Sequence, residues 1–424
     1  MVDRPKTGGM MPQLLRYLQA GVGPIASAGA QFLLSLTLLR MLSPTEFGSF
    51  AFLLVASQFS WGLWSALFCA PLPVLLSEQG KDGMEQIERC MLSTNLVAAI
   101  GALALFFGLG LMLNVPPFAA AIFALYSGVA LLRWLARAHA YALGSPLRTM
   151  MSDIAYSATL VAGIGMMVMT DGKSLELAYT ALLASAIIGM LPFGKRYLAL
   201  QFIRFDPRLI MGYRDIWRRH SGWSLMGVIT TEATANAHVY LVTTLWGPAA
   251  FAPIAASTLL IRPIGVAQKA LNEFERAQMA RQIGAGRIED AIASVRTFRL
   301  VLVLAWIVTA LAIAALLFKA PRLLFPPHYD LPFMIAAGAL WLAVAGVRLV
   351  RAPEGSLLQA AGEFRPLAFA SLWSAGISIA MVLVLLFTMG PLWSIVGILI
   401  GEALFAAVTY VHAHRWRMKQ LRSK

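Results

Sequence analysis

The chain has 424 residues, of which 59% are hydrophobic and only 13% are charged. A soluble domain carries about 25% charged residues, so this composition excludes an ordinary soluble protein. The net charge of +14 would suit a nucleic-acid-binding protein, but the placement of the basic residues explains it without one, and we expect no nucleic-acid partner.

Twelve apolar runs follow one another along the chain, and each reaches the roughly 20 residues that a helix needs to cross a bilayer. They cover about residues 17–39, 47–77, 91–113, 117–143, 150–170, 175–194, 222–246, 250–273, 299–318, 331–350, 366–388 and 392–412. The second run is too long for one straight span, and we expect Pro71 and Pro73 to bend or end it. The first run is interpreted as a retained helix, because a second span follows it at once. The sequence therefore predicts an all-α polytopic membrane protein.

Lys and Arg gather on one side of the predicted spans. With the N-terminus inside, the cytoplasmic segments and the helix ends beside them hold 29 of the 34 Lys and Arg residues. The outer connections hold four, and one, Arg262, lies inside a span. This positive-inside pattern predicts a protein of the plasma (cell inner) membrane with both termini in the cytoplasm, and it favours an even number of spans.

The hairpin between the first two spans recurs later in the chain. Ser43, Pro44 and Glu46 have the form of a capping box that starts a helix. The segment TLWGPAAFAPIAAS repeats this turn 204 residues later, pairing Pro44 with Pro248. The same register pairs Phe47 with Phe251, Met84 with Ile288 and Glu85 with Glu289. The alternative is that short hairpins converge on Pro and Phe by chance.

A duplicated unit of six helices gives both halves the same orientation, as in transporters with parallel repeats, and predicts a cavity between two lobes. The predicted organisation is a cytoplasmic tail (1–16), an N-lobe of six helices (17–194), a basic cytoplasmic linker (195–221), a C-lobe of six helices (222–412) and a basic cytoplasmic tail (413–424). We expect the linker to lie along the inner membrane surface.

Ionisable residues within spans are costly and usually face a cavity or a partner, so they are the candidate substrate-binding residues. Arg262 can hold a diphosphate bidentately, and its alternative role is an ion pair with Glu232 or with Glu402. Glu232 and Asn236 share a helix face with Tyr240, whereas His238 lies beside that stripe. A polar stripe can line a central cavity, or it can serve hydrogen bonds between helices.

Two pairs of arginines lie near the predicted inner ends of spans: Arg133 with Arg137, and Arg348 with Arg351. Snorkelling to the inner interface explains all four, and the alternative is capture of anionic head groups at a cavity mouth. Arg133 and Arg348 are therefore also counted among the candidate substrate-binding residues.

Three residues are candidates for ion coupling: Glu402, which has no obvious local partner, and the already named Glu232 and His238. Asp153 lies near a helix start and is expected to complement the helix dipole. The sequence contains no hydrolase triad, metal-ligand cluster or phosphate-binding glycine loop, so we expect neither an enzyme nor a metal or cofactor.

The stretch LLRMLSPTEFGSFAFLL resembles the first hairpin of the polysaccharide-precursor (O-antigen and exopolysaccharide, Wzx-type) flippases. These belong to the multidrug/oligosaccharidyl-lipid/polysaccharide (MOP) exporter superfamily. The residues that fit are Arg40, Leu42, Ser43, Pro44, Glu46, Phe47 and Gly48. The segment VYLVTTLWGPAAFAPIAASTLLIRPIGV resembles the matching hairpin of the second half. There the chain departs from the family, with Ala237 and His238 in place of an Asp-Arg pair and Ala252 in place of Gly.

The resemblance implies two lobes with twelve or more helices and export of a lipid-linked oligosaccharide by alternating access. Its implied partners are that diphosphate-linked lipid, the membrane lipids, and glycosyltransferases or a polymerase of the same pathway. A multidrug exporter of the same superfamily is the alternative within transport. A non-transporting scaffold or polymerase of a polysaccharide pathway is the alternative outside it.

Overall fold

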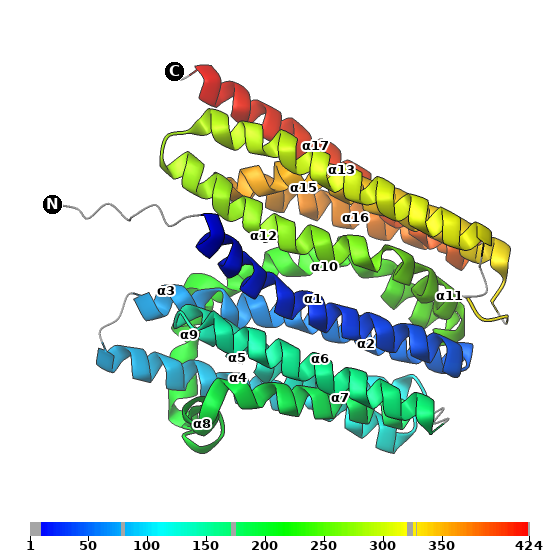
Figure 1. Cartoon of the computed structure of the whole chain (residues 1–424), viewed down its shortest axis with the longest axis horizontal. Coiled ribbons are helices and arrows are strands. Elements are labelled where there is room, and N and C mark those ends of the chain that lie inside the picture. Colours follow the sequence, from blue (N-terminus) through cyan, green and yellow to red (C-terminus); the bar gives the residue numbers. More distant parts are fainter. Residues whose placement is uncertain (1–9, 78–80, 171–174, 320–324, 328, 423–424) are drawn as a thin grey trace. The chain divides into compact units, whose positions relative to one another are not determined.

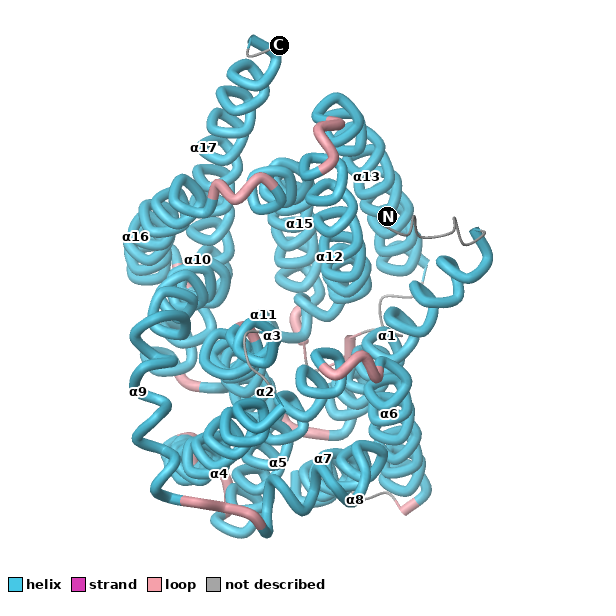
Figure 2. The backbone as a smooth tube through the Cα atoms, turned by 90° about the vertical axis from the view of Figure 1, so that its left-hand side faces the viewer, coloured by secondary structure: helices cyan, strands magenta, loops and turns pink. Residues whose placement is uncertain are grey.

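The computed structural model describes residues 10–77, 81–170, 175–319, 325–327 and 329–422, and this part of the chain is helical, with no strand. The predicted outer-connection residues Lys173 and Arg322 and the first nine residues fall outside it. Nine helices of the described part are long and apolar enough to cross a membrane, and the apolar helix Pro248–Ile261 is shorter. The all-α polytopic fold is confirmed, and Figure 2 shows its helices joined by short loops.

The chain divides into two compact units, the first formed by residues 1–34 and 60–225 and the second by residues 35–59 and 226–424. The helices that begin in the first half are α1 (Met10–Met41), α2 (Pro44–Trp64), α3 (Pro71–Ser77), α4 (Lys81–Met112), α5 (Pro117–Ala142), α6 (Pro146–Met169), α7 (Leu175–Met190) and the short α8 (Gly194–Leu198), and the short α9 (Tyr213–Ile216) follows in the linker. Those of the second half are α10 (Gly222–Trp246), α11 (Pro248–Thr258), α12 (Arg262–Gly284), α13 (Ile288–Lys319), α15 (Leu331–Ala360), α16 (Phe364–Met389) and α17 (Ser394–Arg422) (Figure 1).

Helix starts follow the prolines of the sequence. α5 and α6 both have Pro at their first positions, where the missing N–H costs nothing. The long second run breaks as expected: α2 passes into a π-helical turn at Ser65–Cys69, and α3 starts at Pro71. The division into units cuts α1 and α2, because residues 35–59 group with the second half of the chain. The predicted domain limits stay predictions.

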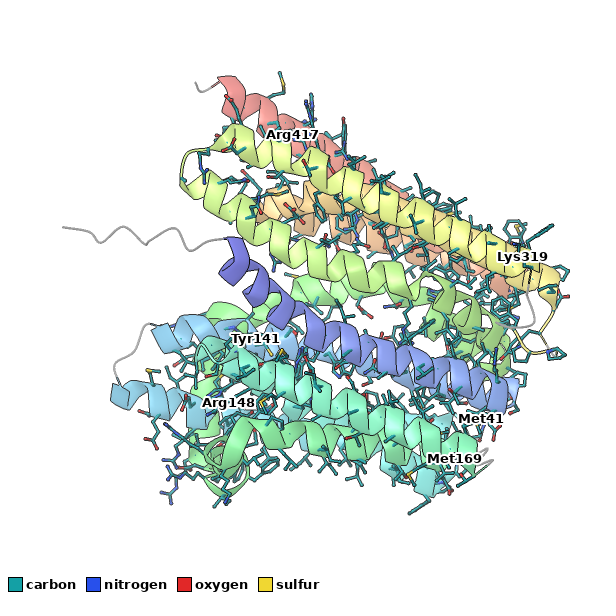
Figure 3. The ribbon with its side chains drawn as sticks, in the orientation of Figure 1. Met41, Tyr141, Arg148, Met169, Lys319 and Arg417 are labelled. Atoms are coloured by element: carbon teal, nitrogen blue, oxygen red, sulfur yellow. The ribbon has the colours of Figure 1, made fainter. Side chains whose placement is uncertain are left out.

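The core of the first unit is aromatic. Phe123 of α5 packs edge-on against Phe106 of α4, with ring centroids 5.8 Å apart, and against Tyr179 of α7 at 4.9 Å. Close helix contact is made possible by small residues: a side chain at Gly163 would lie 2.6 Å from the Cβ of Ala181. In Figure 3 Arg148 lies at one end of this unit and Met169 at the other, as the ends of α6 require.

The predicted linker folds onto the first unit as short helical pieces instead of lying only along a surface. Tyr197, Leu200 and Ile216 belong to a buried cluster of that unit. The Tyr213 hydroxyl donates to the Leu67 carbonyl at 2.7 Å, and burial raises the pKa of Tyr213 to about 12. The thiol of Cys90 donates to the Leu209 carbonyl at 3.1 Å. These contacts fix the linker to the end of the bundle where α3 and α4 meet.

The basic C-terminal tail is a continuation of α17. Ala413 and Trp416 are buried, and Arg417 donates to the carboxylate of Glu354 on α15 at 3.2 Å. Figure 3 shows Arg417 near the C-terminal end of α17, whereas Lys319 at the end of α13 lies at the opposite end of the second unit. The first part of the tail is thus tied to the second unit by packing and by an ion pair.

Candidate functional site

The hairpin at the α1–α2 turn has the predicted capping box. The backbone N–H of Ser43 donates to Glu46 Oε2 at 3.0 Å, and the N–H of Glu46 donates to Ser43 Oγ at 3.3 Å. Phe47 is buried one residue later. A Cβ at Gly48 would lie 1.9 Å from the carbonyl oxygen of Pro248. The two hairpins of the predicted repeat therefore touch within the second unit, and glycine is required at the contact.

Arg262 is the first residue of α12 and follows a 3-10 turn at Leu259–Ile261. Its side chain is half-buried, and Nη1 donates to Ser35 Oγ of α1 at 2.9 Å. The carboxylate of Glu402, a predicted alternative partner, belongs to a different cluster of arginines. The predicted role of Arg262 in holding a diphosphate stays a prediction.

The polar stripe of α10 makes one contact within itself and further contacts with α2. The side-chain amide of Asn236 donates to Glu232 Oε1 at 2.5 Å. The ring of Tyr240 packs against Phe52 and Phe59 of α2, with centroids 5.7 and 6.4 Å away. His238 lies off this stripe, as expected from its position, and is buried against Trp341 of α15 at 5.1 Å. The stripe and His238 therefore face different surroundings. Glu232 and His238, both candidates for ion coupling, thus do not share one site.

The first arginine cluster consists of Arg133, Arg137 and Asp153. Nη2 of Arg133 lies 2.5 Å from Asp153 Oδ1, and Nη2 of Arg137 lies 2.9 Å from Oδ2. The Asp153 side chain is 1% exposed and that of Arg133 is 10% exposed. Nε of Arg133 also donates to Ser152 Oγ at 2.9 Å. The interpretation of these arginines as snorkelling side chains is wrong, and so is that of Asp153 as a dipole complement, because the three groups pair inside the bundle.

The second arginine cluster consists of Arg348, Arg351 and Glu402. Nε of Arg348 donates to Glu402 Oε1 at 2.7 Å, and Nη2 of Arg351 lies 3.3 Å from Oε2. Arg348 also donates to the Ala235 carbonyl of α10 at 3.5 Å, and the guanidinium of Arg351 lies 4.0 Å from the centre of the Phe405 ring. Snorkelling is wrong for this pair too, and Glu402 has the partners that the sequence did not reveal.

A third buried carboxylate was not singled out from the sequence. Glu354 of α15 pairs with Arg299 of α13 and with Arg417 of α17. In the first unit, His139 of α5 lies 3.1 Å from Glu88 of α4. The sequence gives little indication that Glu354 is buried and paired. It lies beyond the predicted span, and its partners are 55 and 63 positions away.

The three carboxylates Asp153, Glu402 and Glu354 are each held by two arginines, so each group carries a net positive charge of one. A charge buried in a bundle is tolerated only when it is paired, which explains the carboxylates. The excess of arginine makes these three clusters cationic. Within the described residues no group of three or more His, Cys, Asp or Glu side chains could hold a metal ion.

No known protein family and no curated protein matches the sequence significantly. Solved structures do match the fold. An inward-facing multidrug resistance MATE family transporter of the MOP superfamily has a TM-score of 0.68 at 15% identity, over 93% of this chain and 95% of that one. The eukaryotic MATE transporter AtDTX14 has a TM-score of 0.67 at 15% identity, over 97% and 100%.

A MOP superfamily transporter from Pyrococcus furiosus, described by the reverse polarity of its binding pocket, has a TM-score of 0.61 at 16% identity, over 96% of each chain. These proteins are transporters, and the identities are low enough that the likeness concerns the fold. Together with the membrane-capable helices, it shows that the chain is a multi-pass membrane protein with the fold of MATE transporters.

Proposed function

We propose that this protein exports a polyprenyl-diphosphate-linked oligosaccharide from the inner to the outer leaflet by alternating access. The observation that carries the proposal is the excess of arginine over carboxylate in the ion clusters, to which Arg262 adds a further cation. A cationic interior suits an anionic cargo, because a buried positive charge is stabilised by a negative one. The fold supports alternating access, since similar structures are described in inward-facing and outward-facing conformations.

In the proposed cycle the lipid tail stays in the bilayer while the diphosphate and the sugar cross. Arg262 contacts the diphosphate with its planar, bidentate guanidinium group. A diphosphate carries about two negative charges, and each charge gains about 2.3 kcal/mol on leaving through an inside-negative potential of 100 mV. Outward passage is then favoured by roughly 4–5 kcal/mol, so no coupling ion is needed on electrical grounds.

The test is flipping in liposomes that contain the purified full-length chain. A fluorescent oligosaccharide on a short-chain polyprenyl diphosphate is placed in one leaflet, and its transfer is followed by a membrane-impermeant quencher. We expect transfer above that of protein-free liposomes, and acceleration by a potential that is negative on the donor side, without a proton or sodium gradient. Absence of transfer under every condition would overturn the proposal.

The second candidate is a multidrug exporter, because the similar solved structures include a multidrug resistance transporter. The same liposomes, loaded with a cationic fluorescent drug, separate the two. Drug efflux without lipid transfer favours the multidrug exporter. Absence of both favours a non-transporting scaffold or polymerase, which can be checked by co-purification of glycosyltransferases.

A further inference from the structure

A groove opens on the second unit between α16 and α17. It has a volume of about 400 Å³. Its lining residues are Phe369, Ala370, Trp373 and Ile377 of α16 and Leu404, Val408 and His412 of α17. The spacing of four along each helix places these residues on facing stripes, about 12 Å long at 1.5 Å per residue. Trp373 is 69% exposed, so the groove is open to the surroundings of the unit.

The groove has a cause in the sequence. At the end where α16 finishes and α17 starts, the helices touch through glycines: a Cβ at Gly397 would lie 2.6 Å from the backbone nitrogen of Val382, and one at Gly401 would lie 2.5 Å from the Cβ of Ser378. The hydroxyl of Ser374 donates to the Gly401 carbonyl at 2.7 Å. Glycines four apart allow this close approach. Beyond Gly401 most residues that line the groove are larger, among them Phe369, Trp373 and Leu404.

The other end of the groove is cationic. The guanidinium of Arg365 lies 5.8 Å from the centre of the Phe369 ring, which lines the groove. His412 is itself a lining residue, and Arg415 lies one turn further along α17 on the same helix face, where it is exposed. An apolar channel that ends at two arginines is complementary to a lipid that has a negatively charged head group.

We propose that this groove binds an anionic phospholipid of the surrounding membrane, with an acyl chain along the α16–α17 stripes and the phosphate between Arg365 and Arg415. Both helices are long and apolar enough to cross a membrane, and in the proposed complex the groove opens toward lipid. Phospholipids are present in great excess over any other lipid, and mass action therefore favours them as occupants. The binding site is separate from Arg262 and does not depend on the function proposed above.

The test is native mass spectrometry of the purified full-length chain after delipidation, titrated with phosphatidylglycerol or with phosphatidylcholine. We expect a single tightly bound phosphatidylglycerol and much weaker phosphatidylcholine binding. The double variant R365A/R415A should bind phosphatidylglycerol roughly thirtyfold more weakly, since each arginine near a lipid phosphate contributes a factor of about five. Val408→Trp should also abolish binding, because it fills the groove and leaves both arginines in place.

Matched controls test whether lipid binding is lost because the groove is changed or because any charge is removed or any tryptophan is added on this unit. The double variant R287A/R296A removes the same charge from exposed positions of the same unit, and Val384→Trp makes the same change on an exposed position of α16 outside the groove. Both controls should bind phosphatidylglycerol like the wild type. Equal losses in variants and controls, or equal binding of phosphatidylcholine, would overturn the proposal. Preference for a polyprenyl phosphate over phosphatidylglycerol would show that the occupant is wrong. Unfolding temperatures in detergent check that each variant is folded.

Discussion

The first and the second arginine cluster are built on the same plan with different helices. In both, two arginines one turn apart on one helix, α5 in the first half and α15 in the second, hold a single carboxylate. Asp153 comes from α6, the next helix along the chain, whereas Glu402 comes from α17, the last one. The clusters also differ in exposure, since the Arg133 side chain is 10% exposed and that of Arg348 is 25% exposed.

One arginine of each pair lies at the same distance from a proline in the two halves, at an offset of 215 residues and not the 204 of the hairpins. Pro117 and Arg133 lie 215 positions before Pro332 and Arg348, so each arginine is 16 residues beyond the proline near the start of its helix. The acidic partner has no such counterpart. One arginine at a matching distance from a proline is thus common to the two halves, whereas its carboxylate partner comes from α6 in one half and from α17 in the other. Replacing Asp153 and Glu402 one at a time therefore tests how much stability each half gains from its own carboxylate.

Asp153→Asn should have the largest effect on stability. It leaves two arginines without their anion in the more enclosed cluster, which is expected to lower the free energy of unfolding by about 3–5 kcal/mol. Glu402→Gln should cost less, about 2–3 kcal/mol, because its more exposed arginines can take a water molecule or a lipid phosphate instead. Thermal unfolding in detergent measures both.

Two controls accompany this measurement. Glu176→Gln changes an exposed acid at the start of α7 and should leave the unfolding temperature unchanged. Arg133→Ala combined with Asp153→Ala should be less harmful than the two single losses added together, because the charges are removed as a pair. A smaller loss for Asp153→Asn than for Glu402→Gln would contradict the ranking of the two clusters.

Arg262 marks a second difference between the halves. In the register of 204 residues its counterpart is Gln58, which has no charge. Arg262→Gln and Arg262→Ala are expected to slow lipid export about thirtyfold, or ~2 kcal/mol, which is the usual loss for a hydrogen bond to a charged group. Arg262→Lys should recover only part of it, because lysine lacks the planar fork. Arg287→Gln is the control on an exposed arginine, and normal export by Arg262→Ala would mean that the residue is structural.

The contact of the two hairpins predicts a smaller effect. Gly48→Ala would place a methyl group within 1.9 Å of a backbone oxygen, which cannot move as a side-chain end could. Such overpacking should lower the free energy of unfolding by about 1–3 kcal/mol. Gly29→Ala is the matched control, because nothing lies within 4 Å of its Cβ and an alanine favours a helix. A stable Gly48→Ala variant would show that the hairpins can separate without cost.

The helices could be predicted because hydropathy and proline act locally. The run at 222–246 has the bounds of α10, and the break before Pro71 follows from the proline itself. Helix ends outside the membrane were harder. α17 continues to Arg422 through a polar stretch that carries no hydropathy signal, and it is held there by Trp416 and Arg417.

The ion clusters could be predicted only in part. Spacing showed that Arg133 and Arg137 share a helix face, but not that α6 lies against that face. A buried arginine requires an acidic partner, and Asp153 is one of the few acidic residues in the apolar runs. Applying this requirement to the sequence would have identified Asp153 as a candidate partner. Glu402 shows the limit of such reasoning, because its partners are 51 and 54 positions away and α16 lies between them in the sequence.

Ala252 gives the finest test of the comparison, because it occupies the position that corresponds to Gly48 in the second hairpin. Its side chain is fully buried, and so the methyl group fits where its counterpart could not. Ala252→Gly removes that methyl and loosens the helix, and we expect a loss of about 1 kcal/mol in the free energy of unfolding. If the two hairpins met symmetrically, glycine would be equally good at both positions and Ala252→Gly would be neutral or stabilising. Thermal unfolding of Ala252→Gly beside Gly48→Ala therefore distinguishes a symmetric contact from one in which glycine is needed on one side only.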